Sequence, residues 1–139
     1  MEDKISIIIE QWKTCVEMAD SISQRRDTFN NIFITLNTAV LSVIILNKDV
    51  DSVCMSVLGI INLIFWLIIV LNFKRLNKAK YKVISEIEKK LPIKAFTNEW
   101  KYAIGENHYI RNTTIEIILI TAFLIIYIYV IVMKIFVIS

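Results

Sequence analysis

Three blocks of mostly apolar residues divide the chain, and each is long enough to cross a bilayer as a helix. They cover residues 28–47, 53–73 and 114–137, and only the last contains charges, at Glu116 and Lys134. A helix of about 20 residues rises about 30 Å, the thickness of the hydrocarbon core. Barrel strands are shorter and alternate in polarity, so they do not fit these blocks. The pattern predicts an all-α, polytopic membrane protein with three spans.

Helical periodicity continues outside the apolar blocks. Residues 3–27 repeat apolar side chains every three or four positions, which predicts an amphipathic helix that runs into the first span or lies on the bilayer surface. Residues 74–112 predict a second helical segment. Pro92 stops one helix there, and Thr97 or Asn98 caps the next. The two segments are expected to form a helical bundle outside the bilayer.

Basic residues are distributed unevenly between the two sides of the predicted spans. Of the 16 Lys and Arg residues, four precede the first block and ten lie between residues 74 and 111. The positive-inside rule therefore places the N-terminus and residues 74–112 in the cytoplasm, with the turn Asn47–Ser52 and the C-terminus outside. Cys15 and Cys54 then lie on opposite sides of the membrane, so we expect no disulfide within the chain.

Catalytic and metal-binding patterns are absent from the sequence. The single His108 has no ligand residue at a suitable helical spacing, and the two glycines cannot build a phosphate loop. Glu116 is the only acid within a predicted span. We therefore expect no enzyme, no metal and no cofactor. The basic run that follows the second span favours lipid headgroups over nucleic acid as its counter-charge.

Polar side chains form a stripe along the first span. Asn31, Thr35, Thr38 and Ser42 follow spacings of four, three and four, and Asn37 lies nearby. Polar groups in a span normally face protein or water rather than lipid. One interpretation is hydrogen bonding between helices. The other is the lining of a pore or cavity built from several subunits, because three spans are few for a single-chain pathway.

The other spans carry weaker signals. Ser56, Gly59 and Asn62 recur every three residues in the second span, which favours close packing against the first. The third span has no glycine and is rich in Ile, Phe and Tyr. It is expected to face lipid, with Tyr127 and Tyr129 in its outer half.

Charged residues of the extramembrane helices predict an ion-pair network between helices or subunits. Its members are Glu17, Asp20, Arg25, Arg26 and Glu99. The pair Arg25-Arg26 has a second interpretation, since two adjacent guanidinium groups also suit anionic lipid headgroups or a nucleotide phosphate.

Two sequence blocks resemble the RipA-family octameric membrane proteins, small bacterial inner-membrane proteins. The first comprises Val16–Arg26 followed by Phe33–Ala39, and the second comprises Leu76–Ile84, Glu86, Glu88, Leu91-Pro92 and Glu99-Trp100. The resemblance implies a homo-oligomer of the bacterial inner membrane, with an octamer as its assembly. The layout is also similar to two-helix membrane effectors of anti-phage systems.

The sequence thus favours an oligomeric, channel-like or membrane-perturbing protein, with a role as a defence or stress effector. The alternative is a structural membrane protein that docks a soluble partner on its cytoplasmic helices. Its expected partners are membrane lipids and further copies of itself. A cytoplasmic protein or a nucleotide signal is a further option, and nucleic acid is not expected.

Overall fold

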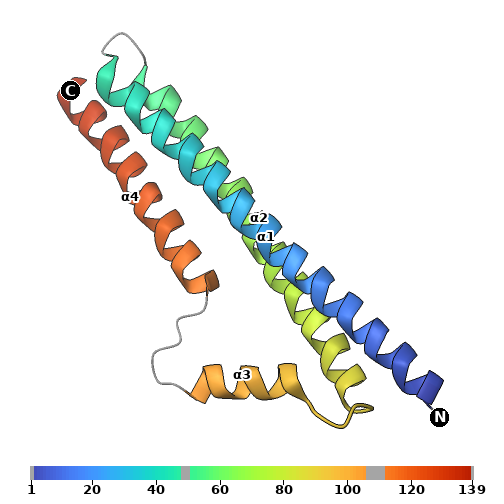
Figure 1. Ribbon diagram of the computed structural model, residues 1–139. Helices are drawn as coiled ribbons and strands as arrows, with labels where there is room; N and C mark the ends of the chain where they lie inside the picture. Colours follow the sequence, from blue (N-terminus) through green and yellow to red (C-terminus); the bar gives the residue numbers. More distant parts are fainter. Residues whose placement is uncertain (1, 48–50, 106–111, 139) are drawn as a thin grey trace. The chain divides into compact units, whose positions relative to one another are not determined.

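Four helices make up the chain in the computed structural model, which describes residues 2–47, 51–105 and 112–138. They are α1 (Glu2–Leu46), α2 (Ser52–Glu88), α3 (Ala95–Gly105) and α4 (Asn112–Ile138) (Figure 1). No strand occurs among these residues. Three of the helices, α1, α2 and α4, are long and apolar enough to cross a membrane. The all-α architecture with three candidate spans is therefore confirmed.

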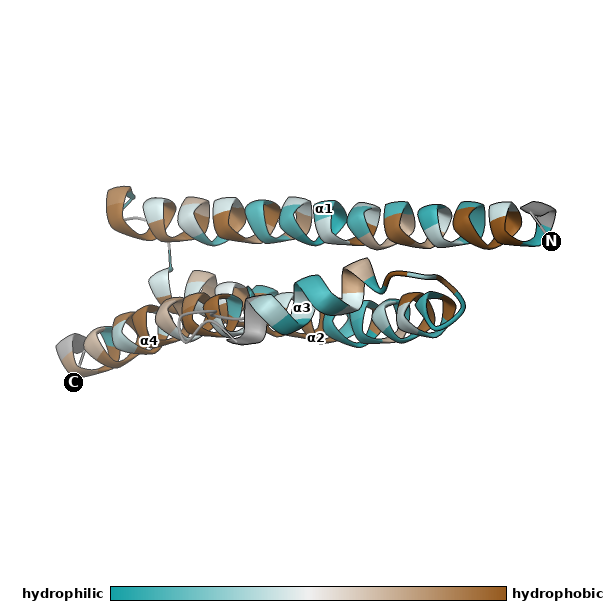
Figure 2. Cartoon of the chain, turned by 60° about the horizontal axis from the view of Figure 1, so that its bottom comes forward, coloured by the Kyte–Doolittle hydropathy of each residue, from teal (hydrophilic) through white to brown (hydrophobic). Residues whose placement is uncertain are grey.

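The chain forms two compact units. The apolar unit contains residues 27–71 and 112–139, and the charged unit contains residues 1–26 and 72–111. Colouring by hydropathy shows α4 as almost wholly apolar, whereas α2 changes from apolar to hydrophilic along its length (Figure 2). The helices α1 and α2 each contribute to both units, and no proline interrupts either of them.

Aromatic and branched side chains form the core of the apolar unit. The buried residues of this core are Phe33, Leu63, Trp66, Val70, Ile120 and Tyr127. Phe33 stacks on Trp66 with ring centroids 5.8 Å apart and an interplanar angle of 5°, and Phe123 meets Trp66 at a tilt. Because lipid tails are as apolar as these side chains, close packing rather than water exclusion holds helices together in a membrane.

One face of the third apolar block is buried against the other helices of the apolar unit. Glu116, Ile120 and Tyr127 follow spacings of four and seven, so they share one helical face, and all three are buried in the apolar unit. Tyr129, by contrast, is 62% exposed. The sequence predicted that this helix faces lipid, and it gave no sign of the face that is buried within the apolar unit. Composition cannot reveal such a face, because nearly every residue of α4 is apolar.

The charged unit packs α3 against the second half of α2. Tyr81 contacts both Phe96 and Trp100, with ring centroids 5.1 and 5.5 Å apart. The helix α2 ends at Glu88, four residues before Pro92, which was expected to stop it, and α3 begins at Ala95 rather than at Thr97 or Asn98. The helix α3 starts earlier because Glu88 of α2 caps its first turn.

Candidate functional site

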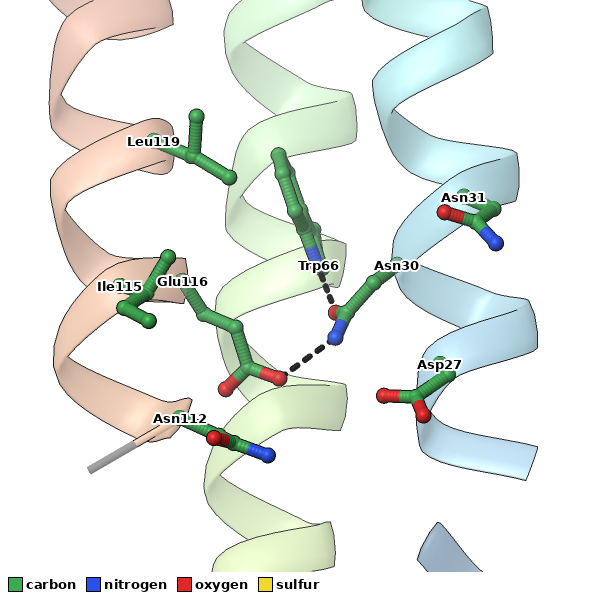
Figure 3. Close-up of a pocket in the computed structure, with 8 residues that line it drawn as sticks. All are labelled: Asp27, Asn30, Asn31, Trp66, Asn112, Ile115, Glu116 and Leu119. Atoms are coloured by element: carbon green, nitrogen blue, oxygen red, sulfur yellow. Dashed lines mark hydrogen bonds between the residues drawn. The ribbon is translucent and has the colours of Figure 1, made fainter. Parts of the chain in front are cut away.

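A chain of side-chain hydrogen bonds joins the three helices of the apolar unit. Asn30 of α1 donates through Nδ2 to Glu116 Oε1 of α4 over 2.5 Å. Its own Oδ1 accepts from Trp66 Nε1 of α2 over 2.9 Å. Figure 3 shows Asn30 between the other two side chains, with both bonds drawn. One amide therefore satisfies a buried indole and a buried carboxylate together, which is needed because unsatisfied polar groups are costly in a membrane.

An open recess of about 370 Å³ surrounds this hydrogen-bonded chain. Its walls are Asp27, Asn30, Asn31, Trp66, Asn112, Ile115, Glu116 and Leu119 (Figure 3). The lining contains two carboxyl groups and three amides. Among the described residues, no three His, Cys, Asp or Glu side chains are arranged to hold a metal ion. The recess is thus lined mainly by polar side chains beside the spans.

A second polar contact lies deeper in the apolar unit, where Tyr127 donates its hydroxyl to Asn37. The distance to Asn37 Oδ1 is 3.0 Å, and the backbone oxygen of Asn37 lies 3.3 Å away. Asn37 Nδ2 donates to the backbone oxygen of Phe33 over 2.7 Å. Asn37 and Tyr127 are both fully buried. The amide therefore ties α4 to α1 within one chain.

Gly59 of α2 makes room for this contact. A Cβ atom at this position would collide with Cζ, Cε1 and Cε2 of Tyr127. Asn30 pairs with Trp66 in the first contact, while Tyr127 touches both Asn37 and Gly59 in the second. On α1, seven residues separate Asn30 from Asn37, and on α2 seven residues separate Trp66 from Gly59. The antiparallel helices are thus in register over two turns.

The predicted polar stripe lies on the outside of the apolar unit. Asn31, Thr35, Thr38 and Ser42 are all exposed, whereas Asn37 is fully buried and lies on the opposite face of α1. A groove of about 380 Å³ follows the stripe from Thr28 to Leu36. Ser42 donates to the backbone oxygen of Thr38 over 2.8 Å, so this hydroxyl is satisfied locally. The structure therefore separates Asn37 from the four residues that share the exposed stripe.

The predicted ion-pair residues of the charged unit are mostly exposed. Glu17, Asp20, Arg25 and Glu99 lie on the surface, and Arg26 is only 7% exposed. Asp20 accepts a hydrogen bond from Gln24 Nε2 over 2.9 Å. None of these observations tests a network between subunits, which stays a prediction.

Glu88 accepts several hydrogen bonds in the charged unit, and the sequence did not single it out as a site residue. Its carboxylate accepts from the backbone N–H groups of Phe96 and Thr97 over 2.7 and 2.9 Å and from the Thr97 hydroxyl over 2.6 Å. These amides belong to the first turn of α3, where a helix needs an acceptor. Burial raises the pKa of Glu88, but these hydrogen bonds lower it by more. The net pKa is therefore below its ordinary value.

Trp12 lies beside the same carboxylate. Its Nε1 is buried and favours the charged form of Glu88, although its geometry falls short of a hydrogen bond to any described residue. Ala19 of α1 and Ile84 of α2 are also buried in the charged unit. On the same two helices, Lys80 Nζ approaches Met18 Sδ at 3.6 Å.

Several residues of these contacts were missed as site residues from the sequence, among them Asn30, Trp66, Glu88, Glu116 and Tyr127. Asn30 and Glu116 were visible as polar groups in apolar blocks, which was the available signal. Their pairing depends on which faces of two distant helices meet. Cys15 and Cys54 are free. His108 and the predicted turn around residues 48–50 lie outside the described residues.

Comparison with known proteins places the chain in a family of membrane proteins. No curated protein and no solved structure is significantly similar to it. Residues 9–136, however, match the octameric membrane protein family, and this match covers α2, α3 and most of α1 and α4. Together with three apolar helices of spanning length, it identifies an oligomeric membrane protein. The chain belongs to the octameric membrane protein family.

Proposed function

We propose that eight copies of this chain form a ring in the membrane, with the polar stripe of α1 facing a water-filled central opening. The observation that carries the proposal is the exposed row Asn31, Thr35, Thr38 and Ser42 on a spanning helix. It lies opposite Asn37, which contacts α4 within the same chain. Polar groups on the outside of a span are costly against lipid, so they need a protein or water neighbour.

Ring geometry favours water over protein for at least part of this stripe. Packed helices lie roughly 8–10 Å apart, and at about 10 Å eight neighbouring α1 helices would form a ring of about 13 Å radius. A helix with its side chains is about 10 Å wide, which leaves an opening of roughly 15 Å. Side chains as short as Thr and Ser cannot close such an opening. Because these Thr and Ser side chains are polar, they favour water rather than lipid tails inside the opening.

The proposal includes a cellular setting. We place the protein in the bacterial inner membrane with the charged unit in the cytoplasm and the C-terminus outside, on the strength of the basic residues before residue 28 and between residues 74 and 111. An opening of this width would dissipate ion gradients. Such an activity suits a channel-like defence or stress effector, of the RipA type or a related one, and requires no catalytic residues.

A second candidate function rests on the charged unit. Ile5, Ile7 and Ile93 are 45%, 54% and 71% exposed there, and Tyr102 is 77% exposed. Exposed apolar side chains of this kind suit a protein partner. In this alternative the ring is a scaffold that docks a soluble protein, and its centre conducts nothing.

Ion flux from liposomes that contain the purified oligomer tests the proposal. We expect flux from the wild-type protein and at least tenfold less from the variant Thr35→Leu/Thr38→Leu, whose stripe repels water. The variant should keep the oligomer mass of the wild type. The exposed residue Ile61 of α2 offers the control Ile61→Leu, which should conduct normally.

Absence of wild-type flux would reject the channel and favour the scaffold. If the double variant falls apart into smaller species, the stripe instead binds neighbouring subunits.

A further inference from the structure

The heptad spacing of the exposed stripe continues upstream through α1. Alternating steps of three and four residues back from Asn31 reach only polar residues as far as Glu10, and the next step reaches the apolar Ile7. The complete row, from here on called the seam, consists of Glu10, Thr14, Glu17, Ser21, Gln24, Thr28, Asn31, Thr35, Thr38 and Ser42. Every member is exposed. A spacing of 3.5 residues keeps such a row on one side of helices that supercoil around a common axis.

Charge is confined to one end of the seam and has one sign. Glu10 and Glu17 are its only charged members. On the flanks of the seam, Lys13 and Arg25 are balanced by Asp20 and Asp27, all of which are exposed. Arg26, the basic residue nearest the bilayer on the other side of α1, is buried. Because an α-helix turns by about 100° per residue, Arg26 lies nearly opposite Glu17. The seam therefore carries a net negative charge in the charged unit and none in the apolar unit.

We propose that the assembly conducts cations in preference to anions, and that Glu10 and Glu17 form two acidic rings that cause this preference. The inference rests on the proposed function, since it assumes that the seam faces the central opening. With eight copies, each ring would hold eight carboxylates. Rings of Asp or Glu side chains are the usual source of cation preference in wide pores, where they attract cations and repel anions without stripping their water.

The size of the opening agrees with this role. In an opening roughly 15 Å across, no ion passes farther than about 8 Å from a carboxylate, which is one Debye length at physiological ionic strength. The field of each ring therefore reaches the axis. At 1 M salt the Debye length falls to about 3 Å, so the charge preference should weaken as the salt concentration rises.

Reversal potentials under a KCl gradient across a planar bilayer test the inference. We expect the wild type to pass K⁺ severalfold more readily than Cl⁻. Glu10→Gln/Glu17→Gln should bring the ratio close to one, and Glu17→Lys should shift it towards Cl⁻. Glu86→Gln is the matched control, because Glu86 is an exposed acid of the charged unit that lies on α2. It should leave the ratio unchanged.

The possible results separate this inference from the proposed function. If wild-type protein does not conduct at all, the channel itself is rejected. If it conducts and the double variant keeps the wild-type ratio, the channel stands and the acidic rings are rejected. Glu17→Asp, which keeps the charge, should conduct with near wild-type preference, and loss of preference in this variant would also count against the rings.

Discussion

Tyr127 of α4 packs the end of its ring against α2 at Gly59, where any side chain would collide with it. The same ring is fully buried, and its hydroxyl donates to Asn37 of α1. A ring in this position cannot move away from α2 without losing its hydrogen bond to α1. Three helices therefore meet at one residue of α4.

Replacement of Gly59 should reveal this arrangement. Gly59→Ala would gain up to about 1 kcal/mol from helix propensity alone. The clash with Tyr127 should outweigh this gain and destabilise the chain by about 1–3 kcal/mol, the usual cost of overpacking. Thermal unfolding in detergent measures the change. In a Tyr127→Leu background the same substitution should be neutral or stabilising, and an equal loss in both backgrounds would contradict the packing described here.

The hydroxyl of Tyr127 should contribute separately from its ring. Tyr127→Phe removes the donor to Asn37 Oδ1 and leaves a buried acceptor unsatisfied, which should lower the free energy of unfolding by about 1–3 kcal/mol. Tyr129→Phe is the natural control, because Tyr129 lies on the same helix and is 62% exposed. It should change stability by less than about 0.5 kcal/mol. Equal effects of the two substitutions would show that the Asn37 contact contributes nothing.

Adjacent asparagines of α1 should respond differently to the same substitution. Asn30→Ala leaves both Trp66 Nε1 and Glu116 without this partner, so we expect a loss of at least about 2 kcal/mol in thermal unfolding. Asn31→Ala removes an exposed side chain and should be close to neutral for the isolated chain. If Asn31→Ala lowers the stability more than Asn30→Ala does, the exposed stripe, and not the hydrogen bonds of Asn30, holds the spans together.

Acidification should loosen α3 through Glu88. The pKa of Glu88 is lowered from 4.5 in the folded protein, so its stabilising effect is complete above that value and is lost as pH falls below it. Hydrogen exchange of α3 amides should therefore speed up below about pH 4.5. Glu88→Gln should speed it up at pH 7 as well, because the neutral amide is a weaker acceptor.

Glu86→Gln provides the control for this prediction, since Glu86 is exposed on the same helix. If its effect on α3 exchange matches that of Glu88→Gln, general charge rather than helix capping stabilises α3.

Sequence patterns predicted the helices better than the contacts between them. The length of each apolar block gave three spans, because a bilayer imposes that length. The roles of Asn30 and Glu116 required knowing that α1 and α4 meet at these positions. Glu88 caps a helix on the far side of a turn around Pro92, and no local spacing rule covers such a contact. The exposed stripe needed only the period of α1, so the sequence did reveal it.

The water exposure of Thr35 in the assembled protein tests the central claim most directly. In a background with Cys15→Ala and Cys54→Ala, Thr35→Cys should react with a membrane-impermeant, positively charged thiol reagent, and the reaction should reduce ion flux. Ile61→Cys is the control, because Asn30–Trp66 pairing places Ile61 of α2 at the depth of Thr35 on the exposed surface. It should stay unreactive in lipid. Protection of Thr35→Cys to the same extent as Ile61→Cys would contradict a water-filled opening lined by α1.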